Sequence, residues 1–314
     1  MKNFRKYLSV TALVLASSFI LSSCNKDDDD PVPNNPVENA SVVSTVVDTD
    51  NFSILEDALI KADLVAALAG DGPFTVFAPT NAAFETLFAD LGVDGIEDLS
   101  AEVLKPILLY HVVGASAKSS SLTSGYYESL NTETPASMAA SIYVEVGSGV
   151  KLNGSSMVST ADVEVSNGVI HIIDKVLMPP TVVDFALSNP NFSILVEAVS
   201  KAGLVDALMS EGPYTVFAPT NEAFEMLFQQ LNVSGIAELT AEALTPILLY
   251  HVVSGNVNAA DVATGMVPTL NESAELSVVV SDMGVMINES SKVVAVDVQG
   301  TNGVIHVIDK VLLP

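Results

Sequence analysis

The sequence predicts an α+β protein that consists of two tandem copies of one domain. Three blocks each occur twice and in the same order: TVFAPTN at 75–81 and 215–221, PILLYHVV at 106–113 and 246–253, and NGVIH at 167–171 and 302–306. About two-thirds of the positions from Phe52 to Val113 match the residue found 140 positions later. A repeat of this length is a duplicated domain, because the units of solenoid proteins are only about 20–50 residues long.

The first half of each copy predicts helices. In the first copy, apolar residues recur at helical spacing from Ile54 to Leu68, and the turn at Gly72-Pro73 ends the pattern. A short buried strand is expected at 74–78, because its residues are apolar or β-branched and Pro79 stops it.

Two further helices are expected after that strand. Thr80 stands at the N-cap position of the first, and Ser100 at that of the second, which should include residues 104–110. Pro106 falls early in this second segment, where a proline is tolerated because first-turn N–H groups have no partner within a helix. The second copy repeats these features 140 residues later.

The second half of each copy predicts strands. Alternating β-branched residues mark several segments: 142–146, 150–152, 163–165, 278–280 and 293–298. Asn167-Gly168 and Asn302-Gly303 are typical of type I′ hairpin turns. The nearly continuous apolar runs that follow, 169–177 and 304–312, should be central strands. Helices that precede strands in this way favour the α+β class.

The two copies differ at their start. Thr-Val-Val-Asp occurs at 45–48 and at 181–184, but Phe52 follows the first after four residues and Phe192 follows the second after eight. The sequence therefore predicts a truncated opening helix in the first copy.

The N-terminus predicts a lipoprotein signal peptide over residues 1–23. Its basic start is followed by an apolar stretch at 10–21, which is shorter than the ~20 residues that a membrane-spanning helix needs. Leu21-Ser22-Ser23-Cys24 resembles a bacterial lipobox, and this resemblance implies lipidation of Cys24 with palmitate-like acyl chains. The alternative is a plain signal peptide with a free cysteine.

Residues 24–39 predict an acidic, proline-containing tether between the lipid and the first domain. Asp27–Asp30 resembles the export signal that directs Bacteroidota-type lipoproteins to the cell surface, although an acidic run is also typical of a solvated spacer. We therefore expect an outer-membrane lipoprotein of the cell envelope, exposed at the surface. The domains should span 40–178 and 179–314.

The charge of the chain excludes one class of partner. Without residues 1–23 the protein keeps nine basic against 38 acidic residues, a net charge near −29, and it contains no arginine. Nucleic-acid binding depends on lysine and arginine contacts to phosphate, so we expect no nucleic-acid partner. Anionic lipid headgroups would also repel the protein, so membrane attachment should depend on the lipid.

The repeated blocks resemble the signature segments of the fasciclin-like domain family. This resemblance implies two tandem domains, each a β-sandwich or wedge with helices packed around it. The family is known mainly for roles in adhesion and the extracellular matrix and not for catalysis, so we expect that the protein is not an enzyme and has no cofactor.

The four histidines all lie in the repeated blocks. A metal site could join these histidines with Asp174 and Asp309. His171 with Asp174, or His306 with Asp309, could instead act in catalysis with a serine. Their apolar neighbours favour a structural role instead, in which the imidazole satisfies backbone groups of the core. No nucleophile motif or metal-binding motif accompanies them.

Two further features are candidate binding sites. Tyr110-His111 and Tyr250-His251 correspond to a segment proposed to contact integrins in animal members of the family, although their apolar flanks favour burial. Tyr126 and Tyr127 are the best candidates for stacking on a sugar, in a chain without tryptophan. We expect non-covalent binding to a protein or glycan at the cell surface, in adhesion or matrix organisation. The alternative is a surface or periplasmic binding module for a glycan or an apolar small molecule.

Overall fold

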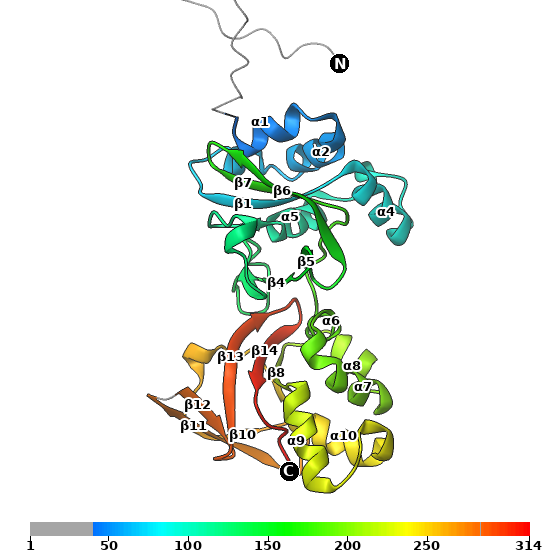
Figure 1. Cartoon of the computed structure of the whole chain (residues 1–314), viewed down its shortest axis with the longest axis vertical. Coiled ribbons are helices and arrows are strands. Elements are labelled where there is room, and N and C mark those ends of the chain that lie inside the picture. The colour runs from blue at the N-terminus through cyan, green and yellow to red at the C-terminus, as the bar shows by residue number, and fades with distance from the viewer. Residues whose placement is uncertain (1–39, 283) are drawn as a thin grey trace, which may run out of the picture. The chain divides into compact units, whose positions relative to one another are not determined.

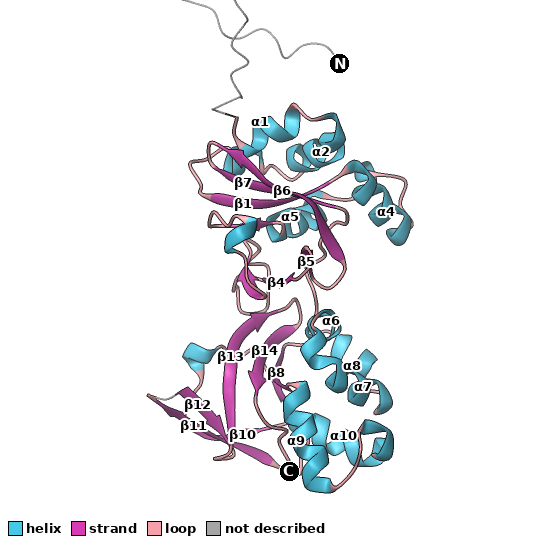
Figure 2. Ribbon diagram, in the orientation of Figure 1, coloured by secondary structure: helices cyan, strands magenta, loops and turns pink. Residues whose placement is uncertain are grey.

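The computed structural model describes residues 40–282 and 284–314, which form two α+β domains of the same architecture (Figures 1 and 2). Each domain contains a seven-stranded sheet with helices packed against it, which confirms the predicted fold class. The signal peptide, Cys24, Asp27–Asp30 and the tether lie outside the described residues. Within the described ranges, no helix is long and apolar enough to cross a membrane.

The elements of domain 1 follow in this order: α1 (Val42–Val47), η1 (Asp50–Phe52), α2 (Ser53–Lys61), α3 (Val65–Leu68), β1 (Phe74–Pro79), α4 (Asn81–Leu91), η2 (Ile96–Asp98), α5 (Ala101–Tyr110), β2 (Val112–Val113), η3 (Ser119–Ser121), β3 (Gly125–Glu128), β4 (Ser141–Val146), β5 (Val150–Leu152), β6 (Ser156–Val165) and β7 (Gly168–Ile173).

The elements of domain 2 repeat that order: α6 (Val182–Ser188), η4 (Pro190–Phe192), α7 (Ser193–Lys201), α8 (Val205–Met209), β8 (Tyr214–Pro219), α9 (Asn221–Leu231), η5 (Ile236–Glu238), α10 (Ala241–Tyr250), β9 (Val252–Ser254), η6 (Ala259–Asp261), β10 (Gly265–Pro268), β11 (Glu275–Ser281), β12 (Gly284–Ile287), β13 (Ser291–Gln299) and β14 (Gly303–Ile308).

In each sheet the first strand of the domain pairs with the last strand. In domain 1 the strand order is β2-β1-β7-β6-β5-β4-β3, and β1 pairs in parallel with β7, whereas its other neighbour β2 is antiparallel. Domain 2 has the same order, with β14 between β8 and β13. The last strand of each domain is therefore interior, as its apolar sequence predicts, but it ends at Ile173 or Ile308, before the apolar run does.

The two faces of β1 serve two cores, because successive strand residues point to opposite sides. Val76 and Ala78 belong to the core beneath the helices, together with Phe84 and Leu104. Phe77 lies in a second core, which is enclosed by the other strands of the sheet. Domain 2 repeats this division around Ala218 and Phe217.

The predicted truncation of the opening helix is wrong. Helix α1 begins after Ser41 and α6 begins after Thr181, and both start with a capping box in which the side chains at the N-cap and N3 positions bond to each other's backbone N–H. Ser41 and Thr181 are 140 residues apart, which is the offset of the first two repeated blocks. The counterpart of Thr181 is thus Ser41, and the Thr-Val-Val-Asp sequence at 45–48 forms the end of α1.

The predicted type I′ turns are also wrong. Strands β6 and β7 are joined through Ser166 and Asn167, and neither residue has the positive φ that such a turn requires. Gly168 is needed for another reason, since a Cβ there would lie 2.0 Å from the carbonyl oxygen of Phe74 on the neighbouring strand. Domain 2 has a longer connection, because β13 ends at Gln299.

Two expectations about the helices need correction. Pro106 lies inside α5, because the helix already begins at Ala101. Thr80 caps α4 by accepting a hydrogen bond from the N–H of Ala83, as predicted, whereas Ser100 precedes α5 without a side-chain hydrogen bond to its backbone.

Candidate functional site

The polar residues of the first signature block bond to backbone within their own domain. The hydroxyl of Thr75 donates to the carbonyl oxygen of Ala115 at 2.5 Å and accepts from the N–H of Ala117 at 2.8 Å. The amide oxygen of Asn81 accepts from the N–H of Ile54 at 3.0 Å. Domain 2 repeats these bonds, so the threonine of this block fixes a loop to the sheet and the asparagine joins the N-termini of two helices.

The tyrosine of each central block is a buried connection between strands. The hydroxyl of Tyr110 donates to the carbonyl oxygen of Ser141 at 2.6 Å and accepts from the side-chain amide of Asn153 at 2.8 Å. Burial raises the pKa of Tyr110 above its ordinary value. Tyr250 makes the same two kinds of hydrogen bond in domain 2.

The neighbouring histidine is held as one neutral tautomer. The backbone N–H of Leu177 donates to Nε2 of His111 at 2.8 Å, so the ring hydrogen must lie on Nδ1, which is 2.7 Å from the carbonyl oxygen of Ile107. Burial lowers the pKa of His111 to about 4, against the opposing effect of that carbonyl. His251 has the same arrangement and a pKa lowered to about 4 by burial.

The histidine of the last block is held as the opposite tautomer, and a β-bulge explains why. The register of β6 and β7 shifts between Thr160 and Val163, which leaves Asp162 outside the ladder with a φ of 61°. The N–H of Asp162 donates to Nδ1 of His171 at 3.3 Å, and Nε2 donates to the carbonyl oxygen of Ala117 at 2.9 Å. His306 does the same for the bulge of domain 2, and burial lowers its pKa.

These contacts are the ones that the structural interpretation of the histidines predicts, because all four imidazoles join backbone segments. Asp174 and Asp309, the other members of the metal interpretation, each accept a hydrogen bond from a backbone N–H of the preceding strand. Across residues 40–282 and 284–314, no three side chains of His, Cys, Asp or Glu are grouped so that they could hold a metal ion.

The structure places the Tyr-His pairs away from open solvent. Tyr110, His111 and their counterparts Tyr250 and His251 are at most 3% exposed, so neither pair presents its polar groups to a partner.

Tyr126 and Tyr127, the candidates for sugar stacking, are half-buried. The ring of Tyr126 packs edge-on against Phe185 of domain 2, its hydroxyl accepts from the side chain of Asn189, and burial raises its pKa to about 12. The hydroxyl of Tyr127 accepts from the N–H of Thr123 at 3.0 Å. Stacking on a sugar would therefore require Tyr126 to leave these contacts.

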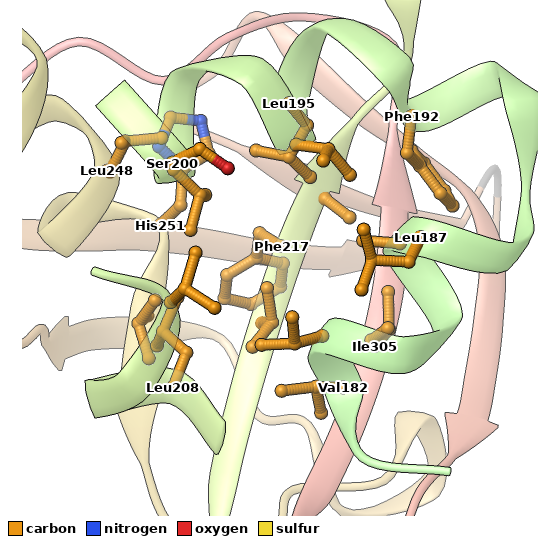
Figure 3. A pocket seen from close by; sticks show the side chains of 18 residues that line it. Val182, Leu187, Phe192, Leu195, Ser200, Leu208, Phe217, Leu248, His251 and Ile305 are labelled. Atoms are coloured by element: carbon orange, nitrogen blue, oxygen red, sulfur yellow. The ribbon is translucent and has the colours of Figure 1, made fainter. Parts of the chain in front are cut away.

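A feature that the sequence analysis missed is an apolar cavity of about 130 Å³ in domain 2. It lies between helices α6, α7, α8 and α10 and the strands β8, β9 and β14, and Figure 3 shows the labelled side chains arranged around it. Phe192 and Ile305 are buried in its wall, while Leu187, which is 60% exposed, stands at the surface. Ser200 and His251 are the polar residues of the lining.

Domain 1 has larger side chains at four of the corresponding positions, and two of the four are buried in its core. Ala186 and Val199 line the cavity, whereas the residues 140 positions earlier are Val46 and Leu59. Val46 is 1% exposed and Leu59 is 4% exposed, and both belong to the core of domain 1. This difference between the copies is the sequence signal that could have located the cavity.

Comparison with known proteins gives consistent matches. A model of the fasciclin domain matches residues 34–179 and 190–314. Protein sll1483 of Synechocystis is 47% identical over 134 residues, which are 43% of this chain and 73% of that protein. Human periostin is 30% identical over 270 residues, or 84% of this chain, and pig transforming growth factor-beta-induced protein ig-h3 is 29% identical over 286 residues, or 89% of it.

The match spans 30% of periostin and 40% of ig-h3, so this chain corresponds to less than half of either protein. A solved FAS1 domain pair from the insect cell adhesion molecule fasciclin I has a TM-score of 0.49 and 22% identity, over 87% of this chain and 96% of that one. The family model covers most of the sequence in two successive matches. The chain therefore belongs to the fasciclin domain family, with two domains in tandem.

Proposed function

We propose that this protein is an envelope lipoprotein that acts by non-covalent binding in cell adhesion or matrix organisation. The observation that carries the proposal is the presence of two tandem fasciclin domains, which in related proteins are associated with adhesion and the extracellular matrix. The lipobox-like segment ending at Cys24 supports attachment to the membrane, and the acidic run behind it supports export to the cell surface.

The proposed binding surface lies outside the Tyr-His pairs. Their polar groups already bond within each domain, and exposing them would break a core that includes Tyr110 and Leu152. Contact should instead involve the exposed outer faces of the domains. The net charge near −29 also predicts that this contact weakens with salt when the partner is cationic, and that an anionic partner needs a divalent bridge.

The experiment that tests this proposal compares cells that carry the protein, lack it, or carry Cys24→Ala. Adhesion to matrix proteins, glycans and other cells should fall in both altered strains, because the variant is made but not anchored. Purified residues 25–314 should bind the same surface directly, in a manner that depends on salt or on a chelator. Unchanged adhesion of the deletion strain, together with no binding by the purified protein, would contradict the proposal.

A further inference from the structure

The cavity of domain 2 is lined in a way that selects an uncharged ligand. Both ring nitrogens of His251 are occupied, since Nδ1 lies 2.8 Å from the carbonyl oxygen of Ile247 and Nε2 accepts from the N–H of Leu312. Ser200, the other polar residue of the lining, is exposed to solvent and is not part of the buried wall. A charged or strongly polar molecule would lose its hydration inside without gaining a partner, so its transfer from water would be unfavourable.

The size of the cavity selects a small ligand. Its volume is about 130 Å³. Apolar protein cavities of about 150 Å³ are known to remain free of water and to bind benzene or xenon. One aromatic ring or a short alkyl group therefore matches this space, whereas a whole fatty acid or a sugar does not.

The position of the cavity gives such a molecule a route from solvent. Leu187 on α6 and Ser200 on α7 are both exposed, and they border a space whose inner wall contains the buried residues Phe192, Leu208 and Ile305 (Figure 3). Exposed side chains change rotamer on the nanosecond scale. Rotation of the Leu187 side chain would therefore change access to the cavity without moving the packed core.

We propose that domain 2 binds one small uncharged hydrocarbon group, of about the size of benzene, in the cavity between α6, α7 and the sheet. Domain 1 should lack this activity, because the buried residues Val46 and Leu59 are larger than their counterparts Ala186 and Val199. This binding is a separate proposal from adhesion, since the ligand would lie against the buried wall of the cavity and not on the outer faces of the domains.

The test uses benzene as the probe and residues 25–314 as the protein. Methyl resonances of the valine and leucine residues around the cavity should shift and saturate with one benzene per chain, while those of domain 1 stay unchanged. The filling variant Ala186→Val/Val199→Leu copies the residues of domain 1, so the fold accommodates them, and it should lose at least tenfold in affinity. The matched control Val46→Ala/Leu59→Val alters only domain 1 and should leave the affinity of domain 2 unchanged.

Two outcomes would overturn the proposal: no saturable shift up to the solubility limit of benzene, or equal affinity in the wild type and the filling variant. If the double variant does not fold, Val199→Leu alone gives the same comparison, since it adds one methylene to the cavity wall. Adhesion measured in the presence of benzene separates the two proposals, because binding in the cavity should leave adhesion unchanged.

Discussion

Asn302 should be one of the most sensitive single positions for the stability of domain 2. Its side-chain oxygen accepts from the N–H of Val182, the first residue of α6, at 2.9 Å. Its amide nitrogen donates to the carbonyl oxygens of Leu208 at 2.8 Å and of Ser210 at 2.9 Å. One side chain, 7% exposed, thus holds the start of one helix, the end of another and the start of β14 together.

The change Asn302→Ala removes all three hydrogen bonds and leaves their backbone partners inside the domain. At ~0.5–1.5 kcal/mol for each bond, the free energy of unfolding should fall by about 3 kcal/mol. For a domain of this size that loss corresponds to a decrease in melting temperature of about 10 °C. The loss should exceed that of a typical surface substitution, which is within about 0.5 kcal/mol.

Urea unfolding followed by circular dichroism measures the effect, with Asn302→Asp as the matched control. The aspartate keeps the acceptor for Val182 but directs a carboxylate oxygen at the carbonyls of Leu208 and Ser210, so it should destabilise at least as strongly as alanine. Asn167→Ala should have the same effect in domain 1, where the equivalent bonds reach Val42, Leu68 and Gly70. A loss below about 1 kcal/mol in both alanine variants would refute the reasoning.

Three further predictions concern pH and the N-terminus. His111 and His251 have pKa values lowered to about 4 in the folded protein, so the unfolded chain binds more protons below about pH 6.5, and the contribution of these histidines to stability falls as the pH drops toward 4. The variant His111→Gln/His251→Gln should lose this pH dependence. If the difference in free energy of unfolding between wild type and variant stays constant from about pH 7 to about pH 4.5, the prediction is wrong. Cys24→Ala should move the protein out of the membrane fraction, and its retention after carbonate washing would show that the lipid is not the anchor. Replacing Asp27–Asp30 by alanine should reduce digestion of the protein on intact cells by added protease, whereas equal digestion would remove the case for an export signal.

The sequence was sufficient to predict the duplication, because the repeated blocks can be compared directly. It also predicted the order of helices before strands and the position of Thr80 as a helix cap, because these features depend on neighbours close along the chain. It also indicated a structural role for the histidines from their apolar neighbours. It could not assign their partners, since the N–H that reaches His171 is freed by a bulge in another strand.

Only the tertiary structure decided the remaining features. The residue pair Asn167-Gly168 suggested a turn. Gly168 is needed because the backbone of Phe74, 94 residues earlier in the chain, leaves no room for a side chain there. The ring of Tyr126 packs against Phe185 of the second domain, a contact that the residues around Tyr126 in the sequence do not reveal. The cavity depends on Ala186 and Val199, whose small size has an effect only where two helices meet the sheet. Local periodicity determines which elements form, whereas burial and close packing depend on residues that folding brings together from distant parts of the chain.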